Sequence, residues 1–248
     1  MIIPFFSFKY FDKKRSEILK SVSIVFDSKY YVLGQNVLKF EKKYSELNEI
    51  KNAVGVSSGL DALIICLKAL NIGKGDEVIV ASNAYIASWL SISAVGAKIV
   101  PVEPDYNTFN IDANKIRSKI NSKTKVIMPV HLFGQSCQMD KIMKIAKKYN
   151  LFVIEDNAQA HLASYKGKFT GTFGNINATS FYPTKNLGAI GEAGCITTND
   201  NNLADYSKSY RNYGYSKKYE CNIKGRNFRI DEIQASILNV KIKYLEEL

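Results

Sequence analysis

Short apolar runs alternate with amphipathic stretches along most of this chain of 248 residues, and this alternation limits the folds that are open to it. The β-branched runs that predict strands lie at residues 52–56, 76–81, 98–104, 124–134 and 151–156. The stretches between them have helical periodicity, as do residues 13–26 and 37–48 before them. Strands that alternate with helices are typical of an α/β fold with a largely parallel sheet flanked by helices.

The alternation stops beyond Gly167. From there to Tyr219 the sequence predicts shorter strands and loops. Residues 229–248 then have the apolar pattern of an amphipathic helix without a stop signal.

Composition excludes several classes of protein. The formal net charge is +11, but the lysines are spread along the chain, which favours a solvated lysine-rich surface. The more specific alternative is a site that attracts an anionic ligand. No helix-turn-helix, zinc-finger or RNP pattern supports nucleic-acid binding. The apolar runs are shorter than the roughly 20 residues of a membrane helix. The N-terminal segment lacks the basic region of a signal peptide, so we interpret it as part of the mature fold.

The cysteines and histidines point to a cytoplasmic protein without a metal site. No two of the four cysteines are spaced as CxxC, and three lie among apolar or small residues, as buried reduced thiols do. Two histidines are too few for a zinc site. The sequence contains no nucleophile elbow of the kind found in hydrolases. A dinucleotide-binding dehydrogenase or epimerase would share the alternation of strands and helices, but the glycine fingerprint of these enzymes is also missing.

Four features follow predicted strands, where open α/β sheets bind ligands. The residues concerned are Ser57–Leu60, Tyr85, Asp156 with Gln159, and the segment 180–188 around Lys185. Each feature alone has an ordinary structural explanation: a tight turn, core packing, a helix cap and a solvated lysine. Together they predict a pyridoxal phosphate site. A half-buried lysine is a nucleophilic amine, a carboxylate pairs with the ring nitrogen, and small residues at a helix start hold the phosphate.

The motifs VGVSSGLDAL, PVHLFG, VIEDNAQAH, SFYPTKNLGAIGEAG and GRNFRIDEIQASIL occur in this order along nearly the whole chain. In these motifs the sequence resembles the DegT/DnrJ/EryC1/StrS family of nucleotide-sugar aminotransferases. The resemblance implies the type I fold of pyridoxal-phosphate transferases, that of aspartate aminotransferase. It also implies a transaminase that takes an amino group from an amino acid and gives it to a nucleotide-linked keto-sugar. We expect the amino acid to be glutamate.

The resemblance also assigns roles to residues. Lys185 matches the lysine that carries the cofactor covalently and moves the proton, and Asp156 matches the partner of the pyridine nitrogen. Gln159 lies over the ring, and Tyr85 stacks on it. The positions that match phosphate ligands are Gly59, Leu60 and Ser180, and, from the neighbouring subunit, Asn227. The match at Asn227 implies a homodimer with shared active sites.

Within the family, AQAH and the stretch NYGYSKKYE look most like the 3-aminotransferases. Those act on dTDP-3-keto-6-deoxyhexoses in the synthesis of surface polysaccharides such as O-antigen. His161 and Tyr182 are then candidates for substrate contact. A 4-aminotransferase of the same family, or a cofactor-binding homologue without activity of its own, stays open as an alternative.

Three departures from the family pattern stand out. Ser58 replaces the usual Asn of the phosphate turn, and Leu162 replaces the usual Gly after His161. Family members also continue for roughly another hundred residues, the size of a small domain. We therefore expect residues 1–228 to be the cofactor-binding large domain. Residues 229–248 then begin the helix that leads to a C-terminal small domain, which the chain lacks.

Overall fold

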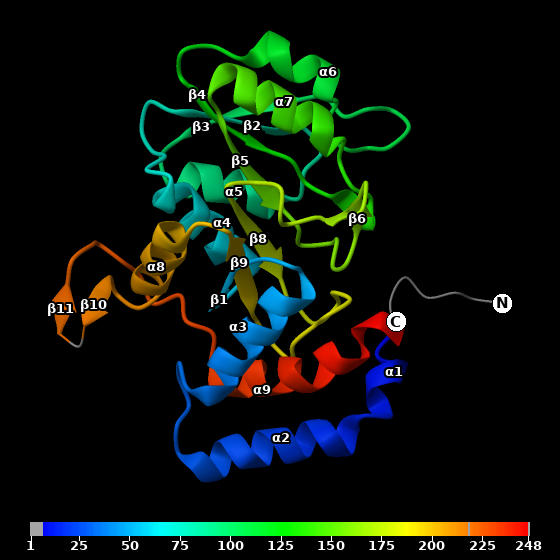
Figure 1. Ribbon diagram of the computed structural model, residues 1–248, viewed down its shortest axis with the longest axis vertical. Coiled ribbons are helices and arrows are strands. Elements are labelled where there is room, and N and C mark those ends of the chain that lie inside the picture. The colour runs from blue at the N-terminus through cyan, green and yellow to red at the C-terminus, as the bar shows by residue number, and fades with distance from the viewer. Residues whose placement is uncertain (1–6, 218, 248) are drawn as a thin grey trace.

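The computed structural model describes residues 7–217 and 219–247, in which a seven-stranded sheet is flanked by helices (Figure 1). The helices are α1 (Lys9–Asp12), α2 (Arg15–Ser28), α3 (Gln35–Leu47), α4 (Gly59–Ala69), α5 (Ile86–Ala94), α6 (Ala113–Ile116), α7 (Met139–Tyr149), α8 (Asn201–Tyr210) and α9 (Glu232–Lys241). Short 3-10 turns are η1 (Arg117–Lys119), η2 (Leu132–Gly134) and η3 (Ile242–Glu247). Residues 1–6, which the sequence predicts to belong to the mature fold, lie outside the described residues.

The strands of the main sheet follow the order β1-β9-β8-β5-β4-β2-β3. They are β1 (Asn52–Val56), β2 (Glu77–Ala81), β3 (Lys98–Val102), β4 (Thr124–Met128), β5 (Phe152–Asp156), β8 (Ile176–Ser180) and β9 (Gly194–Thr198). Two small hairpins consist of β6 (Ser164–Tyr165) with β7 (Lys168–Phe169) and β10 (Tyr215–Lys217) with β11 (Glu220–Cys221). The predicted α/β fold with a mostly parallel sheet is confirmed.

Strand direction determines where loops meet. The pairs from β8 through β5, β4 and β2 to β3 are parallel. Strand β9 is antiparallel to both β8 and β1, so β1 runs in the same direction as β8. The carboxyl ends of all strands except β9 therefore lie at one edge of the sheet, the edge where such sheets bind ligands.

Side chains of successive strand residues enter opposite cores, because the side-chain period of a strand is two. In β2, Val78 and Val80 pack in the core under α4, α5 and α8, whereas Ile79 packs under α6 and α7. At the β1 end, the second face is covered by α3 and α9, whose apolar side chains meet Ala53 and Cys195. Both faces of the sheet are thus buried, as the uninterrupted apolar runs of the sequence predict.

Helix α9 is tied to α3 by a buried carboxylate. Glu232 is 3% exposed, and its two oxygens accept hydrogen bonds from the backbone N–H groups of Gly34, Asn36 and Val37 at 2.8–2.9 Å. The side-chain amide of Asn36 donates a further bond of 2.9 Å. These N–H groups belong to the N-cap and the first turn of α3, where a helix has unsatisfied donors and favours negative charge.

Two local predictions need correction. The stretch expected to form only short strands and loops contains the helix α8, which begins after the cap Asp200. Tyrosine and serine are weak helix formers, but Ala204, Ser207 and Tyr210 recur at helical spacing and are buried. The last helix begins at Glu232 and not at Arg229, because Arg229 is still paired with the end of β1.

Within residues 7–217 and 219–247, none of the helices combines the length and the apolar character that crossing a membrane requires.

The contacts of Glu232 predict a stability effect. We expect Glu232→Gln to lower the free energy of unfolding by about 2–4 kcal/mol, because one amide oxygen cannot satisfy the donors that two charged oxygens satisfy. Urea denaturation followed by circular dichroism measures this change. Glu46→Gln is the matched control: Glu46 is exposed, with Lys42 at 3.9 Å, and a change below about 0.5 kcal/mol is expected. Equal effects of the two substitutions would contradict the role of Glu232.

Candidate active site

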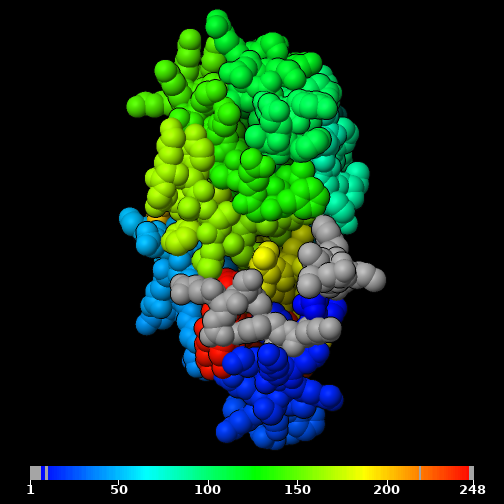
Figure 2. All heavy atoms as spheres, turned by 90° about the vertical axis from the view of Figure 1, so that its right-hand side faces the viewer, coloured from blue at the N-terminus to red at the C-terminus, as the bar shows by residue number. Residues whose placement is uncertain are grey.

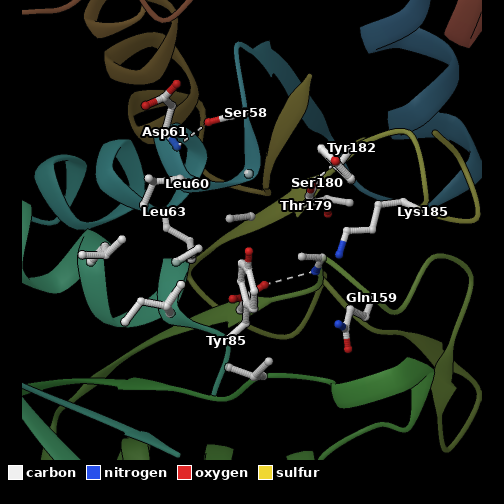
Figure 3. A pocket seen from close by; sticks show the side chains of 18 of the residues that line it. Ser58, Leu60, Asp61, Leu63, Tyr85, Gln159, Thr179, Ser180, Tyr182 and Lys185 are labelled. Carbon is white, nitrogen blue, oxygen red and sulfur yellow. Dashed lines mark hydrogen bonds between the residues drawn. The ribbon is translucent and has the colours of Figure 1, made fainter. Parts of the chain in front are cut away.

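A cavity of about 780 Å³ opens at the carboxyl edge of the sheet (Figure 3). Its wall is contributed by the residues that follow β1, β5 and β8 and by the first turns of α4 and α5. Of the residues predicted for the site, those that line the cavity are Gly59, Leu60, Tyr85, Asp156, Gln159, Ser180, Tyr182 and Lys185. The fold thus brings together segments that are far apart in the sequence.

One end of the cavity has the properties of an anion site. Gly59 and Leu60 are the first residues of α4, whose leading N–H groups have no acceptor within the helix. Ser58 caps the helix by accepting a bond of 3.1 Å from the N–H of Asp61. A Cβ at Gly59 would lie 2.7 Å from that of Ser180, so only glycine lets the helix end approach the Ser180 hydroxyl this closely. A phosphate group here meets donors from two elements.

Asp156 ends β5 and is 5% exposed. One carboxylate oxygen accepts a bond of 2.7 Å from the hydroxyl of Ser88, and the other accepts one of 3.1 Å from the N–H of Ala158. Both partners are neutral, so the buried charge still favours a cationic group on the cavity side. The sequence analysis does not predict Ser88 as a site residue. The only signal for it is a polar residue within the apolar helical stretch IASWLSISA.

The side chain of Lys185 extends into the same space from the loop after β8 (Figure 3). Burial lowers the pKa of its amine, and the negative charge of Asp156 opposes this only in part. A lowered pKa increases the fraction of unprotonated amine at neutral pH, and this is the nucleophilic form.

Tyr85 and Gln159 flank the cavity (Figure 3). Tyr85 precedes α5 and is 69% exposed, so one face of its ring is available to a planar ligand. The side-chain oxygen of Gln159 accepts a bond of 2.8 Å from the N–H of Phe133, which fixes the amide. At the far wall the Ser180 hydroxyl accepts a bond of 3.2 Å from the N–H of Tyr182.

Two predicted site residues do not line the cavity. The ring of His161 packs against Phe181 with centroids 5.6 Å apart. Burial, with the positive charge of Lys185, lowers the pKa of His161 to about 3, so the ring is neutral near pH 7. Asn227 is exposed, and its side-chain oxygen accepts a bond of 2.8 Å from Arg229. Its role in a neighbouring subunit stays a prediction.

The departure at Leu162 has a local consequence. Its backbone φ is 59°, a conformation that glycine adopts without strain and that a leucine rarely adopts. The leucine side chain packs partly against the core between α3, α9 and the sheet.

Solved structures resemble this fold closely. DesV of Streptomyces venezuelae, in complex with a ketimine intermediate, superposes with a TM-score of 0.96 at 42% identity, over 99% of this chain and 66% of DesV. NtdA of Bacillus subtilis, with bound cofactor PMP, gives a TM-score of 0.90 at 34% identity, over 95% of this chain and 54% of NtdA.

Relatives in sequence carry related names. A dTDP-3-amino-3,6-dideoxy-alpha-D-galactopyranose transaminase of Aneurinibacillus thermoaerophilus is 53% identical over 99% of this chain. A GDP-perosamine synthase of Caulobacter vibrioides is 42% identical over 87% of it. The chain spans 68% of the length of the first relative and 58% of the second. The DegT/DnrJ/EryC1/StrS aminotransferase family matches residues 12–248. The chain therefore belongs to this aminotransferase family, as the sequence motifs predict.

Proposed function

We propose that the protein, with pyridoxal phosphate as its cofactor, transfers an amino group from an amino acid to a keto-sugar carried by a nucleoside diphosphate. One observation supports this most directly: the Lys185 amine and the buried Asp156 carboxylate face a single cavity whose other end is the N-terminus of α4. The residues of the cavity fit the cofactor because they supply an amine, a carboxylate and phosphate donors in one space. Pyridoxal phosphate, when bound, supplies the electron sink for amino-group exchange.

The residues of this chain have separable tasks. Asp156 holds a proton on the ring nitrogen by its charge, and Ser88 orients the carboxylate. The first turn of α4 and Ser180 bind the phosphate, and Tyr85 supports the ring. Lys185 would hold the cofactor covalently, and its amine, once the amino group of the substrate has displaced it, would carry the proton that leaves Cα of the amino acid. A lowered pKa suits a base that works near neutral pH.

We propose a specific class of sugar substrate. The name of the 53%-identical relative favours a dTDP-linked 3-keto-6-deoxyhexose as the substrate. Glutamate is the amino donor that we propose. The product is then an amino sugar for surface polysaccharide. The GDP-perosamine synthases among the relatives support a second candidate, a GDP-linked keto-sugar.

The proposal includes a homodimer in the cytoplasm. Asn227 lies on the exposed surface beside Asn212, whose side-chain oxygen accepts a bond of 3.2 Å from Arg229. We propose that from there it contacts the phosphate that is bound by a second copy of the chain. Because the relatives are longer, cofactor binding without turnover is the alternative for the 248 residues alone.

Lys185→Ala tests the central role. With added pyridoxal phosphate and borohydride reduction, peptide mapping of the unsubstituted protein should find the cofactor on Lys185. The variant should show no attachment and lose at least about 10²–10⁴-fold in transamination, the range that a general acid–base group contributes. Lys208→Ala, at an exposed lysine next to Asp205, is the control and should behave like the parent protein. Attachment at another lysine would contradict the assignment.

Asp156→Asn tests the partner of the ring nitrogen. Asparagine retains the size of the side chain but removes its charge, so the nitrogen loses its stabilised proton. We expect turnover to fall about 10²-fold, since an opposite charge nearby commonly shifts a pKa by about one to three units. The cofactor should still attach to Lys185. Unchanged turnover would mean that another residue holds this proton.

Steady-state turnover with matched dTDP- and GDP-linked keto-deoxysugars separates the two sugar candidates. We expect kcat/KM for the dTDP-linked 3-keto-sugar to exceed that for the GDP-linked 4-keto-sugar by about 10-fold or more. The reverse order would favour the GDP-linked candidate. Turnover of neither, with the cofactor on Lys185, would favour a cofactor-binding homologue.

A further inference from the structure

The loop that carries Lys185 connects β8 to the reversed strand β9 and has little regular structure of its own. Three backbone bonds of 2.8 Å shape it: from the N–H of Lys185 to the carbonyl of Tyr182, from Ala189 to Phe181, and from Phe181 to Ala193. It folds back so tightly at Gly188 that a Cβ there would lie 2.4 Å from the carbonyl oxygen of Pro183. The loop therefore depends on outside contacts to stay in place. Figure 2 shows yellow residues of this region between the green upper part of the molecule and the blue and red helices below.

Helix α9 holds the loop at two points. The side-chain oxygen of Gln234 accepts a bond of 2.9 Å from the N–H of Ile190, and its nitrogen donates one of 3.3 Å to the carbonyl of the same residue. Two turns along the helix, the amine of Lys241 donates a bond of 2.6 Å to the carbonyl of Gly188. Both contacts are to backbone atoms that follow Lys185 by three to five residues.

Lys241 is an unusual residue for this position. It is 3% exposed, and no ion pair with a carboxylate forms at it within the described part of the chain. Burial lowers its pKa to about 8, and its amine lies 4.2 Å from the ring centroid of Phe11. A buried cation without a carboxylate is costly, and its hydrogen bond to the loop and its contact with the Phe11 ring offset this cost.

The helix that supplies these contacts is itself fixed. Glu232 caps α3, and the side-chain amide of Asn239 donates a bond of 2.8 Å to the carbonyl of Asn36. Ala235 and Leu238 are fully buried against α3 and the sheet. Movement of the loop relative to the cavity is therefore opposed by a rigid element.

We propose that Lys241 and Gln234 are positioning residues, which keep the Lys185 amine in the cavity by holding the backbone of its loop. The proposal rests on the proposed function of Lys185, but its test does not require the cofactor. Neither residue lines the cavity, so each acts only through the loop. Titratable groups that influence Lys185 are Asp156 and His161, and both are outside the loop.

The test is the reactivity of Lys185 in cofactor-free protein. Trace acetylation by acetic anhydride, measured by peptide mass spectrometry across a pH series, gives the apparent pKa of each lysine. In Lys241→Met and Gln234→Leu, the freed loop should let the Lys185 amine reach water. Its apparent pKa should then rise toward the ordinary value, which lowers the unprotonated fraction at neutral pH below that of the parent protein.

Lys243→Met is the matched control, because Lys243 lies two residues further on and pairs with Glu17, away from the loop. It should leave the apparent pKa of Lys185 unchanged. An unchanged value in folded Lys241→Met and Gln234→Leu would overturn the proposal, even if their melting temperatures fall. If Lys241→Met does not fold, Gln234→Leu decides alone. Failure of the parent protein to attach pyridoxal phosphate at Lys185 would instead refute the proposed function.

Discussion

The common direction of every strand but β9 in the main sheet is the constraint on which the rest of the structure depends. Both faces of the sheet are buried, so chain segments that return across them must be amphipathic and bring the next strand back in the same direction. The ends of β1, β5 and β8 then meet at one edge. Ser58, which follows β1, and Asp156, which ends β5, therefore line one cavity.

Buried carboxylates join segments that the sheet alone does not hold. Glu155 accepts bonds of 2.6–2.9 Å from the N–H groups of Gly171, Phe173 and Gly174, and its oxygen lies 2.9 Å from Nε2 of His131. The N–H of Cys137 donates to Nδ1 of this histidine, so a neutral ring already supplies the proton on Nε2. Charge of this kind is tolerated because several donors replace the lost water. The same arrangement recurs at Glu232.

The sequence predicts what is local and periodic. Apolar runs identify β1 to β5, whereas β8 and β9 lie beyond Gly167, where the sequence predicts only shorter strands and loops. Cofactor-site candidates lie at or after strand ends, so parallel topology brings Asp156 and the start of the Lys185 loop to one edge of the sheet. Such patterns do not predict partners that are far apart in the sequence, because no regular spacing relates them. Examples are the contacts of Ser88 with Asp156, of Glu232 with the start of α3, and of Lys241 with Gly188. The sequence also does not predict helix α8, because the packing of its buried side chains overrides the weak helix propensities of its residues.

The exception in strand direction explains why Lys185 needs support that the other site residues do not. Residues after β1 and β2 continue into α4 and α5, whose packing on the sheet fixes Gly59 and Tyr85. The chain after β8 turns back directly into β9, so no crossover helix stabilises the loop. A loop without a crossover helix would move more than the helices beside it. Helix α9 lies against this loop, and its side chains form hydrogen bonds with the backbone at Gly188 and Ile190. These bonds support a loop that no crossover helix supports.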